Sequence, residues 1–191
     1  MRKSFVIGTM LAVPALAAAA ALAPLSIQPG SRVWVEGTST VRAWRCESAR
    51  GDGSAAASTT ELAQLGSVSR AEFSVPVATL DCRNQTMNGH MRNALKADAA
   101  PQIRFRATSV QVTPTSADAG TAKMEGTLTL GGQDKPVSID ATVAREDGQL
   151  RVRGSKRLVM TEWGVRPPTL MLGTMKVNPA VTVGFDVVLK P

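Results

Sequence analysis

The chain has 191 residues, of which 22 are Lys or Arg and 15 are Asp or Glu, giving a net charge of +7 at neutral pH. The basic residues are scattered, and no basic run is interleaved with aromatic residues, which excludes a typical nucleic-acid-binding surface. The positive charge suits either a plainly solvated surface or contact with anionic lipid head groups or a phosphorylated ligand.

The first residues have the pattern of a secretory signal peptide. A basic start, Arg2-Lys3, precedes the apolar, alanine-rich run Phe5–Leu22. We therefore expect a cleaved signal peptide over residues 1–21, with its boundary between 18 and 23, and then a linker over 22–31. An uncleaved membrane anchor is the alternative, although the apolar run is barely long enough to span a bilayer. The signal-peptide interpretation places the protein in the periplasm or otherwise outside the cytoplasm, as one domain over 32–191.

The first strands are separated by a stretch of low complexity. A long run rich in β-branched and aromatic residues covers 32–45, and a segment rich in Gly, Ser, Ala and Thr follows, predicting a flexible insertion over 48–67. In the next strand, Phe73, Val75 and Val77 share one face. Pro76 cannot donate a ladder hydrogen bond, so this strand should have an edge or a bulge there.

Cys46 and Cys82 are the two cysteines of the chain. An even number of cysteines in an exported protein predicts a disulfide, which would enclose most of the low-complexity segment. A zinc site with His90 and a redox pair are the alternatives. Zinc normally needs closer spacing and more ligands, and a redox pair usually has two residues between its cysteines. We therefore expect a structural disulfide and no bound metal.

A short amphipathic helix is predicted over about 87–97. Its apolar positions recur at helical spacing, and its polar positions should face elsewhere. The apolar set is Met87, Met91, Ala94 and Leu95, and the polar set is His90, Arg92, Asn93 and Lys96. Pro101 disfavours helical geometry at the residue before it, and so helps to end the helix.

The rest of the chain alternates apolar and polar residues with period two, as half-buried strands do. Alternation covers 103–108, 124–130, 137–143, 150–153 and 181–189, and Gly131-Gly132 and Asp147-Gly148 provide hairpin turns. On this pattern Arg104, Arg106, Arg151 and Arg153 should point outward into solvent. Six or more such strands with one helix predict an all-β barrel or sandwich, whose apolar faces could enclose either a solid core or a ligand.

Several short motifs, in this order, resemble the YceI-like family of periplasmic polyisoprenoid-binding proteins. They are Val75–Leu80, Asn88–Arg92, Pro101–Phe105, Gly126–Leu130 with Lys135–Val137, and Gly164–Pro168. The chain departs from the family pattern in lacking a glycine-rich hairpin after the first strand and in carrying the cysteine pair. It also has Asn93-Ala-Leu95 where relatives often have aromatic residues.

The resemblance implies an extended, antiparallel, lipocalin-like barrel of about eight strands with one short helix packed against it, holding a long isoprenoid chain. Its apolar lining would come from alternating strand positions and from methionines, which adapt to irregular shapes. The expected lining residues are Phe73, Val75, Val77, Met87, Met91, Leu95, Ile103, Phe105, Leu128, Leu130, Met160, Met171, Val183 and Phe185. His90 and Arg92 are candidates for head-group contact, because a guanidinium can grip a diphosphate through two hydrogen bonds.

No arrangement of a nucleophile with a base can be argued from the sequence, and Asp81, Asp140 and Asp186 stand in turns or on outward faces without a pairing motif. We therefore expect a non-enzymatic, exported lipid-binding protein without a cofactor, which holds an isoprenoid or similar lipid and touches an anionic membrane peripherally. The alternative is a filled-core barrel that acts on a partner protein through its basic surface.

Overall fold

The computed structural model describes residues 24–57, 60–68, 70–170 and 174–191. The strands are β1 (Leu25–Ile27), β2 (Arg32–Ser39), β3 (Ala43–Ser48), β4 (Asp52–Ala55), β5 (Ser67–Val68), β6 (Ala71–Pro76), β7 (Gln102–Pro114), β8 (Ala119–Leu130), β9 (Gln133–Glu146), β10 (Gln149–Val159), β11 (Thr169–Leu170) and β12 (Met175–Lys190). The helices are α1 (Leu62–Leu65) and α2 (Gln85–Ala94), with 3-10 turns η1 (Val77–Thr79) and η2 (Met160–Trp163).

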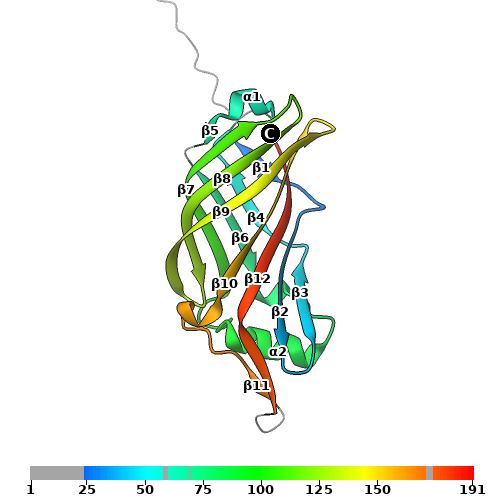
Figure 1. Cartoon of the computed structure of the whole chain (residues 1–191), viewed down its shortest axis with the longest axis vertical. Coiled ribbons are helices and arrows are strands. Elements are labelled where there is room, and N and C mark those ends of the chain that lie inside the picture. The colour runs from blue at the N-terminus through cyan, green and yellow to red at the C-terminus, as the bar shows by residue number, and fades with distance from the viewer. Residues whose placement is uncertain (1–23, 58–59, 69, 171–173) are drawn as a thin grey trace, which may run out of the picture.

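The strands form a closed, antiparallel barrel, as Figure 1 shows from the side. Neighbours around the wall are β1, β4, β6, β7, β8, β9, β10 and β12 in that order, and β1 closes the ring by pairing with β12 through Ser26 and Ile27. Strands β2 and β3 continue the sheet from β12, while β5 and β11 add short pairings to β7 and β12. The predicted all-β barrel of about eight strands is therefore confirmed.

Two predicted turns set the register of strands β8, β9 and β10. Gly131 and Gly132 have φ of 57° and 80° and join β8 to β9, while Asp147 and Gly148 have φ of 51° and 72° and join β9 to β10. Two successive positive φ values are the requirement of the two-residue hairpin that matches the twist of a sheet. Because side chains alternate between faces, this register carries the apolar residues of all three strands to the interior.

Buried apolar clusters lie toward the two ends of the barrel. We call these the α1 end and the α2 end, after the helix found at each (Figure 1). At the α1 end, Leu62 and Leu65 are 0% and 3% exposed and pack with Val110 and Val143. At the α2 end the buried cluster comprises Val77, Leu80, Leu95, Leu158, Met160, Trp163, Val165 and Val181.

The N-terminal third differs from the sequence prediction. The expected linker 22–31 contains β1, whose Leu25 is 1% exposed, and the expected insertion 48–67 contributes β4 and α1. The run 32–45 is not one strand but parts of two, β2 and β3, joined by a turn that Ser39 holds through hydrogen bonds with Arg42. These elements are too short, or too rich in small residues, to show a hydrophobic period.

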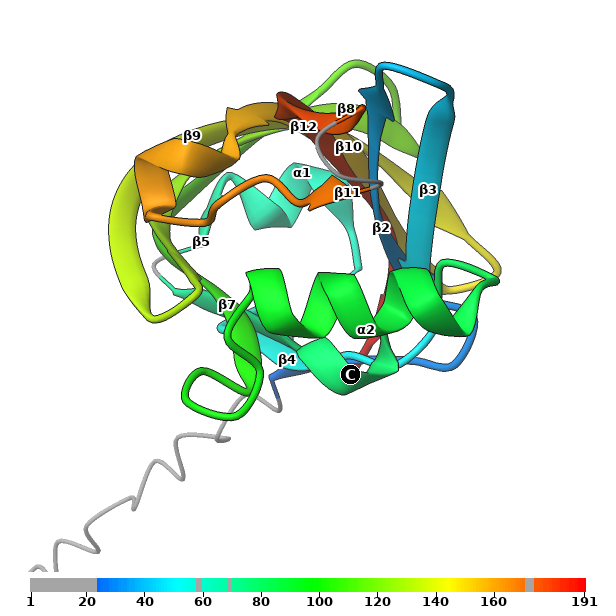
Figure 2. The same cartoon turned by 90° about the horizontal axis from the view of Figure 1, so that it is seen from below.

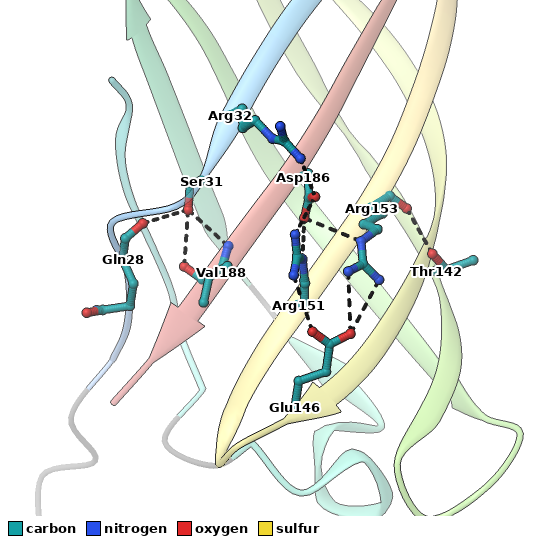
Figure 3. A network of polar contacts seen from close by, with 9 residues as sticks. All are labelled: Gln28, Ser31, Arg32, Thr142, Glu146, Arg151, Arg153, Asp186 and Val188. Atoms are coloured by element: carbon teal, nitrogen blue, oxygen red, sulfur yellow. Dashed lines mark hydrogen bonds and ion pairs between the residues drawn. The ribbon is translucent and has the colours of Figure 1, made fainter. Parts of the chain in front are cut away.

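The outward-pointing arginines are paired rather than merely solvated. Figure 3 shows Asp186 on the outer face of β12, where its side chain is 8% exposed and accepts hydrogen bonds of 2.7 Å from both Nε and Nη2 of Arg151. Arg153 and Arg32 approach the same carboxylate at 3.5 and 3.6 Å. The hydrogen bonds from Arg151 hold the pKa of Asp186 below its usual range although burial opposes this. Asp186 is thus a structural ion-pair centre, which the sequence pattern did not predict.

The predicted signal peptide and its cleavage boundary lie outside the described residues. Among the helices that the structure describes, none is both long and apolar enough to cross a membrane.

Candidate functional site

A long apolar cavity runs inside the barrel. The space open to the centre of a water molecule is about 310 Å³, within the range of small-molecule sites. Its lining reaches from Leu25 and Leu65 at the α1 end to Met91 and Val177 at the α2 end. Along β12 alone it extends from Val177 to Leu189, a path of about 40 Å at the usual rise per residue, or roughly 30 Å along the axis of a barrel with tilted strands.

The alternating strands account for the composition of this lining. The inward residues of β12 are Val181, Val183, Phe185, Val187 and Leu189, and all five line the cavity. Cross-strand partners continue the same face, since Phe185 lies opposite Gly154 on β10 and Phe105 of β7 lies opposite Phe73 of β6. The surface of the cavity is therefore almost wholly hydrocarbon. The cavity also shows that core side chains do not fill the whole interior of the barrel.

Most of the residues predicted to line the cavity do so. They are Phe73, Val75, Met87, Met91, Leu95, Ile103, Phe105, Leu128, Leu130, Met160, Val183 and Phe185. Val77 is not among the lining residues, because the chain leaves β6 at Pro76 and turns into η1, where Val77 packs in the cluster at the α2 end. Met171 lies outside the described residues.

Helix α2 lies across one end of the barrel, as the view along the barrel in Figure 2 shows. It spans Gln85–Ala94, shorter than the predicted 87–97, and Met87, Met91, Ala94 and Leu95 face the cavity as expected. His90 was expected to face away, but it is half-buried and lines the cavity. Its position three residues after Met87 and four before Ala94 places it on the same face. Arg92 is exposed and does not line the cavity.

The start of α2 is fixed by a dense set of contacts. Asn84 caps the helix by accepting a hydrogen bond from the Met87 N–H at 3.0 Å. Asn88 accepts from the Cys82 N–H at 2.7 Å and donates to the carboxylate of Asp81 at 3.0 Å. The hydrogen bond from Asn88 is the main reason that the pKa of Asp81 lies below its usual range. These contacts hold the first turn of the helix in one position.

The predicted disulfide joins Cys46 of β3 to Cys82, just ahead of α2. Beside it, Glu47 and Asp81 exchange two backbone hydrogen bonds of 2.9 Å. The bond therefore fastens the segment that carries α2 to the barrel wall, and cysteines joined in this way are not zinc ligands. Among the described residues no group of three or more His, Cys, Asp or Glu side chains is arranged to hold a metal ion.

Lys156 also lines the cavity and is half-buried. On β10 it follows Leu150, Val152 and Gly154 at period two, so the alternation places it on the inward face. The sequence analysis missed it because a lysine interrupts an otherwise apolar face, although its long stem can cover apolar surface. Hydrogen bonding from Ser138 is the main cause that lowers the pKa of Glu125, and the charge of Lys156 contributes.

The two ends of the cavity differ in burial. At the α1 end the lining residues Leu25, Leu65 and Leu150 are 1%, 3% and 4% exposed. At the α2 end Met87, His90, Met91, Pro168 and Val177 are only half-buried. These half-buried residues lie on α2 and on the segments around η2 and β11, beside buried lining residues such as Leu95 and Val165, which are 6% and 3% exposed.

The sequence matches the model of the YceI-like domain over residues 30–189. The chain belongs to the YceI-like family. The barrel is similar to BcnA of Burkholderia cenocepacia, with a TM-score of 0.67 and 15% identity over 85% of this chain and 98% of that one. It is equally similar to a polyisoprenoid-binding domain of Saccharophagus degradans, with a TM-score of 0.67 and 12% identity over 88% of this chain and 98% of that one.

A YceI protein of Campylobacter jejuni is also similar, with a TM-score of 0.54 and 17% identity over 73% of this chain and 80% of that one. At such low identities the likeness to these solved structures concerns the fold of the YceI-like barrel. A search among curated proteins finds no significant match.

Proposed function

We propose that this YceI-like protein is an exported, non-enzymatic lipid carrier that holds one long isoprenoid or similar amphipathic chain inside its barrel. The observation that carries the proposal is the apolar cavity of about 310 Å³ that reaches from the α1 end to the α2 end. A polyisoprenoid-binding domain with the same fold supports it.

The length of the cavity favours a long single chain. A path of roughly 30 Å matches the whole hydrocarbon thickness of a bilayer, which two acyl tails normally share. A water-sized group occupies about 10–15 Å³ on the same measure of volume. The cavity of about 310 Å³ thus has room for roughly 20 to 30 such groups. A chain of this kind suits the site better than a single fatty acid.

Hydrophobic burial would supply the affinity. Each CH₂ group removed from water contributes about 0.8 kcal/mol, so ten or more groups outweigh any single polar contact. Met87, Met91 and Met160 add adaptable side chains at the α2 end of the lining. Any polar head group would meet few polar partners in this lining, so it is expected near the α2 end, where His90 is half-buried.

A carrier role outside the cytoplasm agrees with the chemistry of the chain. The Cys46–Cys82 disulfide is typical of an oxidising compartment, and the family is one of periplasmic binding proteins. The lining contains one histidine and no serine–histidine–carboxylate arrangement among the described residues, which supports binding rather than catalysis. The positive net charge favours transient contact with anionic lipid.

Filling the cavity tests the proposal. Ile103 is a half-buried lining residue, so Ile103→Trp should project an indole ring into the path of the chain. We expect this variant to fold but to lose uptake of a long polyprenol, measured by native mass spectrometry after incubation with the lipid. Val159→Trp is the matched control, because Val159 lies outside the lining and is 38% exposed. Undiminished uptake by a folded Ile103→Trp protein would contradict the proposed site.

A further inference from the structure

The surface around the α2 end carries exposed positive charge. Arg42, Arg92, Lys96, Arg166 and Lys176 are all exposed, and we call these five residues the basic rim. None of them forms an ion pair with a residue that the structure describes, whereas most arginines of the barrel wall do. Charges without partners are available to a ligand or a surface outside the protein.

Contacts between segments place the basic rim at the α2 end. The Arg42 guanidinium reaches the Sδ of Met87 at 3.7 Å, joining the β2–β3 turn to α2. Thr40 of that turn donates from its N–H to the carbonyl of Lys176 at 3.0 Å. Arg166 follows η2 and precedes β11, which lies at the same end (Figures 1 and 2). The cations therefore lie around the α2 end of the cavity.

Acidic residues at this end do not cancel the basic rim. Asp81 is held by Asn88 and by the Arg83 N–H, and Asp134 accepts a hydrogen bond of 2.6 Å from Thr129. Asp98 and Glu162 are exposed. Glu47, whose backbone pairs with Asp81, has its carboxylate bound to Arg45 at 3.0 Å. Among the described residues, the exposed cations at the α2 end (the basic rim with Arg83) therefore outnumber the exposed carboxylates there.

The charges at the α1 end are mostly paired. Arg145 is bound there to Glu61 and Asp118 at 2.8 Å, and Glu146 is bound to Arg151 and Arg153 at 3.3 and 3.4 Å. Arg70, Lys190 and Asp147 are exposed. The two ends therefore differ in how far their charges are paired rather than in sign.

An exposed apolar residue stands among the cations. Val41, at the tip of the β2–β3 turn, is 65% exposed. Val159, at 38%, is the other exposed large apolar residue among those that the structure describes. The side chain of Ser39 fixes this tip by accepting hydrogen bonds from the N–H groups of Val41 and Arg42. An apolar tip flanked by cations is the combination that inserts shallowly into an anionic lipid surface.

We infer that the α2 end docks on an anionic membrane surface, with the basic rim on the head groups and Val41 at the interface. The inference rests on the proposed carrier function, because a chain passing between bilayer and cavity avoids water only if the end through which it enters faces the membrane. Each CH₂ group exposed on the way would otherwise cost free energy. The α1 end, where most charges are paired, would face away.

Binding to vesicles tests the inference. The purified protein should co-sediment with vesicles of phosphatidylcholine and phosphatidylglycerol, bind phosphatidylcholine alone much more weakly, and lose binding at high salt. In the double variant Arg166→Gln, Lys176→Gln, affinity for the anionic vesicles should fall by about fivefold for each charge, hence about 25-fold. The control Arg70→Gln, Lys190→Gln removes the same charge from exposed residues near the α1 end and should retain most of the binding.

Equal losses in the two double variants would overturn the inference, since they would show a diffuse effect of net charge. Failure of the unaltered protein to bind anionic vesicles would overturn it as well, and would favour a protein partner for this surface. Native mass spectrometry of the same three proteins reports separately on the cavity. A protein that binds vesicles through the basic rim yet never takes up a polyprenol would retain the docking surface and reject the carrier function.

Discussion

Replacing Asp186 by Asn should destabilise the barrel strongly. The carboxylate is 8% exposed and accepts two hydrogen bonds of 2.7 Å from Arg151, with Arg153 and Arg32 at 3.5 and 3.6 Å. An amide keeps one acceptor oxygen but loses the charge, and its NH₂ group faces guanidinium donors. The loss of one charge-assisted hydrogen bond, together with charges left without a partner, is expected to cost about 2–4 kcal/mol.

Glu72 provides a matched comparison on the same outer wall. It also lies between two arginines, with Arg104 and Arg106 at 3.5 Å, but its side chain is 42% exposed. Glu72→Gln should therefore cost less than about 1 kcal/mol. Urea unfolding followed by circular dichroism measures both changes as shifts in midpoint at constant slope. Equal shifts for the two variants would refute the argument that burial determines the strength of these ion pairs.

The effect of Asp186 should also depend on pH. Its pKa is lowered in the folded protein, chiefly by the hydrogen bonds from Arg151. A lowered pKa stabilises the fold fully above the unfolded-state value of about 3.9, and this contribution is lost as the pH falls toward the folded-state pKa. The difference in stability between the unaltered protein and Asp186→Asn should therefore be large at neutral pH and shrink in acid. A difference that stayed constant down to strongly acidic pH would contradict this assignment.

Three further variants test the packing and the placement of helix α2. Removing the disulfide by Cys46→Ala with Cys82→Ala opens a loop with a sequence separation of 36 and should lower stability by up to about 4 kcal/mol in urea unfolding. Gly126→Ala should lower stability by about 1–3 kcal/mol, because its Cβ would meet the carbonyl of Arg106 across the strand pair. In Gly89→Ala, the added Cβ in α2 meets nothing within 4 Å. This variant should gain up to about 1 kcal/mol of stability, seen as a higher melting temperature. A loss of stability would contradict the placement of the helix.

The long strands were predictable because most of their side chains alternate between apolar and polar. Val137, Ile139, Ala141 and Val143 specify an inward face, and two-residue turns with positive φ fix the register on both sides of β9. The disulfide was predictable from cysteine number and compartment. By contrast, β1 contributes three residues and α1 four, too few for any period to emerge, although they complete the α1 end of the barrel.

The candidate site was predictable in its lining but not in its polar residues. His90 and Lys156 occupy inward positions by spacing, yet the polar side chain of His90 suggested the opposite face and Lys156 was missed. Only the closed barrel shows that a half-buried side chain there lies beside the cavity. The Asp186 ion pairs depend on the pairing of β10 with β12, in which Arg153 lies opposite Asp186. Such pairing between strands that do not follow each other directly is set by the closure of the sheet.

Native mass spectrometry of the purified protein, followed by solvent extraction and identification of the lipid, tests the carrier function most directly. The cavity predicts one bound molecule per chain, with a single chain long enough to span roughly 30 Å. An isoprenoid of that length would support the proposal, and a phospholipid or fatty acid would retain the cavity but reject isoprenoid specificity. A protein that is isolated empty and stays empty after incubation with polyprenols would contradict the carrier function.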